Sequence, residues 1–157
     1  MPKSSRFAVF GIGRYGHQIA LSLAAKGAEV FTFDSDPSRS EAIKDEVALA
    51  VTMDATDARA LQAQNVQDMD AAVVAIGENF EATMLTSMNL LDLGVPRVIV
   101  RSSGDHQKRI LTSLGIREIL TPESEVASIV SERLIHPNIG GFLELPDDYE
   151  IAEIHAP

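Results

Sequence analysis

Residues 11–16 read Gly-Ile-Gly-Arg-Tyr-Gly, a spacing of glycines that brings backbone N–H groups close to a bound anion. Gly11 permits a tight turn, Gly13 lets a phosphate approach the main chain, and Gly16 permits close packing of the helix that follows. Asp34 ends the next apolar run, where its carboxylate can accept hydrogen bonds from ribose hydroxyl groups and would repel a 2′-phosphate. These residues predict a nucleotide site that disfavours NADP. The alternative is a glycine-rich turn that binds nothing.

The elements around these residues fit the same prediction. Apolar residues 7–10 precede the glycines, a helical stretch continues to about Lys26, and a second apolar run covers residues 29–33. Strand, glycine turn, helix, strand and terminal acid in this order form the context that makes the glycine motif specific.

The alternation of strands and helices continues along the chain. Helices are expected at about 37–45, 57–64, 80–93 and 105–114, and strands at 48–53, 71–76, 98–100 and 118–120. Right-handed crossovers then place the strands in the order 3-2-1-4-5-6. We therefore predict an α/β fold, a Rossmann-like doubly wound parallel sheet of six strands.

The pattern changes after residue 120. Thr121-Pro122-Glu123 begins one more helix, which runs to about residue 135, and Pro137, Asn138, Gly140 and Gly141 suggest a hinge-like break. Short alternating runs at 142–145 and 149–154 look like strands with no partner left to pair with. We expect a nucleotide-binding lobe at 1–122, a helical connection at 123–141, and the start of a small, truncated lobe at 142–157.

Ligands of doubly wound sheets bind outside the carboxyl ends of the strands. The residues there are Gly11, Ile12, Gly13, Arg14, Tyr15 and Gly16; Asp34, Ser35 and Asp36; Asp54, Ala55 and Thr56; Ala75, Ile76 and Gly77; Arg101; and Glu123. For some of these residues a purely structural role is the alternative. Asp54 and Thr56 also suit a turn or a cap, Arg101 a surface ion pair, and Glu123 the first turn of a helix.

Arg14 distinguishes among nucleotides. Many NAD enzymes carry a small or apolar side chain inside this turn, whereas an arginine can pair bidentately with a terminal phosphate. Arg14 therefore favours ADP or ATP over NAD. The alternative is a solvent-exposed arginine on the first helical turn.

Composition narrows the class of protein. The chain has 157 residues, of which 45% are hydrophobic and 23% charged, which suits a soluble domain with a sizeable core. No run approaches membrane-spanning length and no signal-peptide pattern follows the first residues, so we expect no direct membrane insertion. The absence of cysteine fits a cytosolic protein, and the net charge of −10 argues against a nucleic-acid partner.

A small NAD-dependent oxidoreductase is the enzymatic alternative. No Tyr-x-x-x-Lys pattern occurs, and the histidines at 17, 106, 136 and 155 lack an acid partner at a strand end. We expect that the protein is not an enzyme.

Several segments together resemble the RCK (KTN) domain of the gating subunits of bacterial Ktr and Trk potassium transporters. They are residues 7–16, 32–34, Asp54-Ala55-Thr56, 75–77 with Asn79, and Thr121-Pro122-Glu123. The resemblance covers about residues 6–154, and the run at 149–154 resembles the opening of the smaller C-terminal lobe of that family.

The resemblance implies a cytosolic regulatory subunit that forms homodimers through the crossover helix at 123–141. Such dimers assemble into an octameric ring beneath a membrane potassium-translocating subunit, at the inner face of the membrane. Exchange of ATP against ADP in the Ktr branch, or of NADH against NAD in the Trk branch, changes the shape of the ring and gates the pore. A Ktr arginine matching Arg14 reaches the terminal phosphate, and a glutamate matching Glu123 binds a divalent cation such as Mg²⁺ or Ca²⁺. Both residues favour the Ktr branch, although a related efflux regulator remains an alternative.

Overall fold

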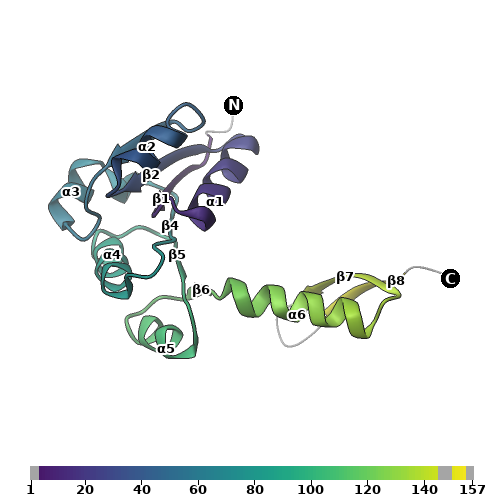
Figure 1. The fold of residues 1–157 in the computed structure, drawn as a ribbon. Coiled ribbons are helices and arrows are strands. Elements are labelled where there is room, and N and C mark those ends of the chain that lie inside the picture. Colours follow the sequence, from purple (N-terminus) through teal and green to yellow (C-terminus); the bar gives the residue numbers. More distant parts are fainter. Residues whose placement is uncertain (1–3, 145–149, 155–157) are drawn as a thin grey trace. The chain divides into compact units, whose positions relative to one another are not determined.

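The computed structural model describes residues 4–144 and 150–154, which divide into two compact units, 1–120 and 121–157. In the first unit, six parallel strands form one sheet in the order β3-β2-β1-β4-β5-β6, as predicted (Figure 1). The strands are β1 (Arg6–Phe10), β2 (Glu29–Asp34), β3 (Leu49–Thr52), β4 (Ala71–Val74), β5 (Val98–Arg101) and β6 (Glu118–Leu120). The helices are α1 (Arg14–Ala25), α2 (Pro37–Ile43), α3 (Ala58–Ala63), α4 (Phe80–Asp92) and α5 (Asp105–Ser113), with a 3₁₀ turn at Val66–Asp68.

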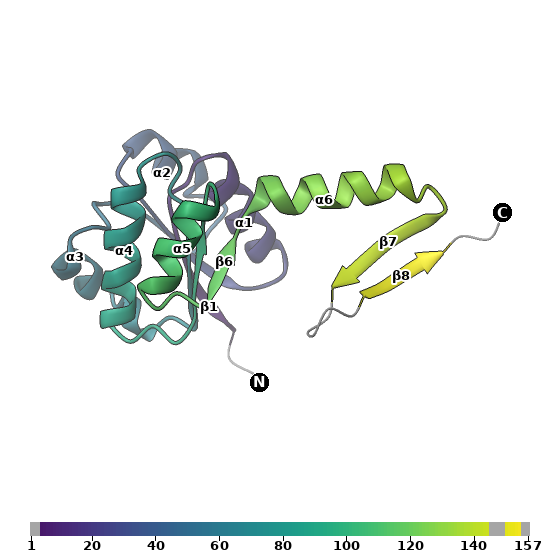
Figure 2. The same ribbon diagram turned by 90° about the horizontal axis from the view of Figure 1, so that it is seen from below.

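Alternate residues of the central strands bury into two cores, one on each side of the sheet. Phe10 lies with residues of α3, α4 and α5, and its ring stacks on that of Phe33 with centroids 4.9 Å apart. Val9 faces the other way and packs with α1 and α2. Figure 2 shows the two groups of helices on opposite sides of the sheet. Because the six strands of this sheet run parallel, their carboxyl ends lie at one edge.

The helix starts follow their capping residues. Asp36, Asp57 and Asn79 precede α2, α3 and α4, and each side chain accepts a hydrogen bond from an N–H group of the helix it precedes. Helix α1 differs because Gly13 stands at the capping position and has no side chain.

The second unit contains α6 (Pro122–Ile135), β7 (Ile139–Glu144) and β8 (Glu150–Ile154). The prediction that the two last strands lack partners was wrong, because β7 and β8 pair with each other as an antiparallel hairpin. Gly140 and Gly141, predicted as a break, lie inside β7, where the register shifts between Ile139 and Gly141. Such an irregularity accommodates glycine in a strand. Leu145 and Tyr149, the remaining residues of the predicted strands, lie outside the described residues.

No helix in the described ranges combines the length and the apolar character that a membrane crossing requires.

Candidate functional site

The glycine turn packs tightly against the segment that follows β4. Gly11 has a φ of +88°, and its N–H donates to the Phe33 carbonyl over 2.9 Å. A Cβ on Gly11 would lie 2.8 Å from the Ile76 Cα, and a Cβ on Gly16 would lie 1.8 Å from the Gly11 carbonyl oxygen. Two of the three glycines are therefore required by the packing of the turn itself.

Gly13 is different, because its neighbourhood is open. Apart from Gly13 and its two chain neighbours, the nearest described atom to a Cβ built there is Nη1 of Arg39, at 3.9 Å. Gly13 begins α1 without a side-chain cap, and the first turn of that helix carries no acidic residue. The start of α1 thus offers unblocked main chain and the positive end of the helix dipole, the arrangement that binds phosphate groups.

Asp34 lies beside this turn with its carboxylate buried. Oδ2 accepts a hydrogen bond from the Ile12 N–H over 2.6 Å, and Oδ1 accepts one from the Asp36 N–H over 2.8 Å. The sequence pattern predicts only a ribose contact for this acid. The structure shows a second role, because the hydrogen bonds to this carboxylate connect the glycine turn with the end of β2. A carboxylate has further lone pairs, so the predicted ribose contact remains compatible with this geometry.

Arg39 was missed by the sequence reasoning. It comes from the first turn of α2, and its Nη1 lies 3.6 Å from Oδ2 of Asp34. Its Nε lies 3.9 Å from Oδ2 of Asp36, the capping residue of the same helix. The available signal was a basic residue in the first turn of the helix that follows the terminal acid of β2.

Asp36 caps α2, and its side chain is more exposed than that of Asp34. Its Oδ1 accepts hydrogen bonds from the hydroxyl and the N–H of Ser38. These two bonds, with a smaller contribution from the Arg39 charge, hold the pKa of the Asp36 carboxyl below its ordinary value. Ser35, between the two acids, is exposed.

The loop after β3 adjoins Asp34, because the Met53 N–H donates to the Asp34 carbonyl over 3.0 Å. Within this loop, Oδ1 of Asp54 accepts hydrogen bonds from the hydroxyl and the N–H of Thr56, at 2.7 and 2.9 Å. Both bonds lower the pKa of the Asp54 carboxyl. Asn89 of α4 donates to the Thr56 carbonyl over 2.9 Å and anchors the loop. The Thr56 hydroxyl proton is thus engaged within the turn, which leaves its oxygen as an acceptor.

Strand β4 ends at Val74, two residues before the predicted end, and Ala75 and Ile76 form the wall of the glycine turn. The Ala75 N–H donates to the Phe10 carbonyl over 2.7 Å, and its Cβ is the nearest side-chain atom to a Cβ built on Gly16. Gly77, which follows, is exposed, and beyond its chain neighbours no described atom lies within 4 Å of the position of its missing Cβ.

Arg101 ends β5, and its guanidinium lies over the Tyr15 ring, 5.1 Å from the ring centroid. This contact joins the end of β5 to the first turn of α1. The structure therefore brings the predicted residues after strands β1 to β5 to one edge of the sheet.

Glu123 belongs to the second unit, where it is exposed in the first turn of α6. Within residues 4–144 and 150–154, no group of three or more His, Cys, Asp or Glu side chains is placed to hold a metal ion. The cation predicted at Glu123 stays a prediction.

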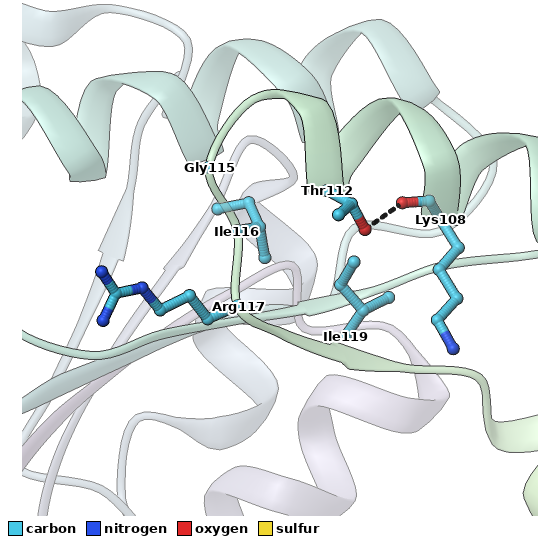
Figure 3. Close-up of a pocket in the computed structure, with 6 residues that line it drawn as sticks. All are labelled: Lys108, Thr112, Gly115, Ile116, Arg117 and Ile119. Atoms are coloured by element: carbon cyan, nitrogen blue, oxygen red, sulfur yellow. Dashed lines mark hydrogen bonds between the residues drawn. The ribbon is translucent and has the colours of Figure 1, made fainter.

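A hollow of about 580 Å³ lies elsewhere, between α5 and β6 (Figure 3). It is lined by Lys108, Thr112, Gly115, Ile116, Arg117 and Ile119, and it contains none of the residues predicted for the nucleotide. In Figure 3, Lys108 and Arg117 lie on either side of Ile116 and Ile119. The candidate nucleotide site rests instead on the main-chain geometry at Gly13 and on the neighbouring Asp34.

Comparisons with known proteins agree with this fold. The family model described as the TrkA-N domain matches residues 7–122. The Ktr system potassium uptake protein C of Bacillus subtilis is 33% identical over 150 residues, which cover 96% of this chain and 68% of that protein. The Ktr system potassium uptake protein A of the same organism is 29% identical over 154 residues, covering 98% of this chain and 69% of that protein.

Solved structures show the same fold at lower identity. The TrkA-N domain of the inner membrane protein YbaL from Escherichia coli has a TM-score of 0.73 at 17% identity, covering 87% of this chain and 100% of that one. The GsuK channel bound to NAD has a TM-score of 0.69 at 12% identity, covering 94% of this chain and 27% of that one. GsuK bound to ADP has a TM-score of 0.65 at 12% identity, covering 77% and 32%.

Proposed function

We propose, since this chain belongs to the TrkA-N domain family, that it is the nucleotide-sensing regulatory subunit of a bacterial potassium transport system. The observation that carries the proposal is the uncapped start of α1 at Gly13, beside the buried carboxylate of Asp34. The two Ktr potassium uptake proteins support the transport role. Nucleotide binding shifts the conformation of such a subunit by its difference in affinity for two states, and no chemical step is needed. The protein is therefore proposed to be a regulator and not an enzyme.

The proposed ligands are ATP and ADP. Arg14, the first residue of α1, is exposed beside the open main chain of Gly13, where its guanidinium can reach a terminal phosphate. NAD and NADH are the second candidates, because structures of the related fold of GsuK are described with NAD and with ADP. Isothermal titration with ATP, ADP, NADH and NAD separates the two. Tighter binding of ATP or ADP supports the first ligand pair. Tighter binding of NADH or NAD supports a Trk-type regulator instead, or the alternative of an NAD-dependent oxidoreductase.

The proposed cation is Mg²⁺ or Ca²⁺ at Glu123. The same titrations with and without each ion test it, because a cation shared with the nucleotide makes ATP affinity depend on the ion. Unchanged ATP affinity would remove Glu123 from the site.

Replacing Arg14 by alanine is expected to weaken ATP binding by about tenfold, because a charge-assisted bond to the γ-phosphate is lost. ADP lacks that phosphate, so its affinity should stay nearly unchanged, and any preference for ATP should disappear. Titration of both nucleotides into both proteins measures the difference. Equal losses for the two nucleotides would contradict the role of Arg14.

The proposed partners are a second copy of the chain and a membrane potassium-translocating subunit, which would hold this cytoplasmic protein at the inner face of the membrane. Helix α6 supports the first, because Val126, Ile129, Val130 and Leu134 are 57%, 47%, 47% and 76% exposed. Their spacing places them on one stripe of the helix. An apolar stripe of this kind suits a homodimer through α6, and dimers of this kind would assemble into the octameric ring.

Placing glutamate at both Val126 and Val130 is expected to convert the dimer to a monomer, because paired helices would bury like charges without partners. Light scattering coupled to size exclusion gives the mass. The first unit should keep its thermal stability, since neither residue belongs to it. A variant that remains dimeric would place the interface elsewhere.

A further inference from the structure

Arg39 lies beside the open main chain of the glycine turn. Its Nη1 lies 3.9 Å from the position of a Cβ on Gly13 and 3.6 Å from Oδ2 of Asp34. Among the described residues other than Gly13 and its two chain neighbours, no other heavy atom lies within 4 Å of that Cβ position. The guanidinium therefore lies close to main chain that an anion can approach.

The present partners of Arg39 leave its donors available. Its two ion pairs, to Asp34 at 3.6 Å and to Asp36 at 3.9 Å, are longer than hydrogen bonds. Within the described residues, its guanidinium makes no hydrogen bond. The side chain is 52% exposed, whereas that of Asp34 is 4% exposed. An arginine with five N–H donors, half in solvent and held only by charge, can turn toward a stronger anion at little cost.

We propose that Arg39 is a ligand-binding residue that pairs with the 5′-phosphates of the nucleotide at the glycine turn. The inference rests on the proposed function and adds a second cation to the same site. Two observations favour the 5′-phosphates over a phosphate on the ribose. Arg39 reaches Gly13, where the main chain is open, and a 2′-phosphate would meet the carboxylates of Asp34 and Asp36. Arg14 would then bind the γ-phosphate of ATP, and Arg39 would bind the phosphates that ATP and ADP share.

The test compares Arg39→Ala with the unmodified chain in titrations with 5′-ADP, 5′-AMP, adenosine and inorganic pyrophosphate. We expect about tenfold weaker binding of ADP, AMP and pyrophosphate and unchanged binding of adenosine. Arg39→Lys keeps the charge without the planar fork and should fall between the two proteins. Arg117→Ala is the matched control, because it removes an exposed arginine before β6, away from the carboxyl edge.

The outcomes separate the inference from the proposed function. Equal or tighter binding of ADP to Arg39→Ala would overturn the inference and leave nucleotide sensing in place. An equal loss of adenosine binding would also overturn it, because Arg39 would then act only by positioning Asp34. If the unmodified chain binds pyrophosphate but no nucleotide, the proposed function fails, and the pyrophosphate ratio still tests Arg39. If it binds neither, both fail.

Discussion

Replacing Gly16 by alanine is expected to prevent folding of the first unit or to cost at least about 4 kcal/mol of unfolding free energy. The new methyl group would lie 1.8 Å from the Gly11 carbonyl oxygen and 3.3 Å from the Cβ of Ala75. The first of these contacts is with backbone, which no rotamer change can relieve. Circular dichroism during urea unfolding measures the loss. A variant as stable as the unmodified chain would mean that α1 can move away from the turn without penalty.

Gly13→Ala is the matched control, because it adds the same methyl group two residues from the start of the motif. Beyond its two chain neighbours, the nearest described atom to its Cβ would be Nη1 of Arg39, at an ordinary contact distance of 3.9 Å. The unfolding free energy should change by less than about 1 kcal/mol. Nucleotide affinity, however, should fall more than about tenfold, since the methyl group blocks the approach of a phosphate. Loss of folding in both variants, or of affinity in neither, would contradict this division of roles among the glycines.

Replacing Asp34 by alanine should lower the unfolding free energy by about 2–3 kcal/mol, because it leaves the Ile12 N–H buried without an acceptor. The bond to the Asp36 N–H is lost as well. Nucleotide affinity should also fall, since the ribose loses its predicted acceptor and Arg39 loses its nearer carboxylate. Urea unfolding and titration, the latter well below the unfolding temperature, measure the two effects separately.

Asp57→Ala provides the comparison. Its carboxylate also accepts hydrogen bonds from two backbone N–H groups, those of Arg59 and Ala60, but it is exposed at the start of α3. Water can replace the lost acceptor there, so the expected cost is that of an ordinary helix cap, about 1 kcal/mol. Nucleotide binding should be unchanged. If the two variants are equally stable, burial of Asp34 contributes nothing to the fold.

The fold was largely predictable from the sequence, because its signals are local. Apolar runs, the caps at Asp36 and Asp57, and the glycines that end helices each act within a few residues of the chain. The alternation of elements then leaves few topologies, since parallel crossovers are right-handed. The strand order and the gathering of the candidate residues at one edge both follow from that alternation.

The last strands show where such reasoning failed. Alternating residues indicate a strand but do not name its partner, and the pairing of β7 with β8 joins two separate segments of the chain. Gly140 and Gly141 read as a break because glycine weakens a strand. Pairing along the hairpin outweighed that preference.

The candidate site also has features that the sequence predicts and features that only the tertiary structure shows. The sequence by itself determined the glycine turn and the acid at the end of β2, because their chemistry depends on residue type and spacing along one βαβ unit. Only the tertiary structure decided that Asp34 holds the Ile12 N–H and that Arg39 stands over Gly13. These contacts join residues far apart in the chain, and their geometry depends on how α1, β2 and α2 pack. Spacing along the chain brings a functional group to the edge of the sheet, and packing determines which neighbour it meets there.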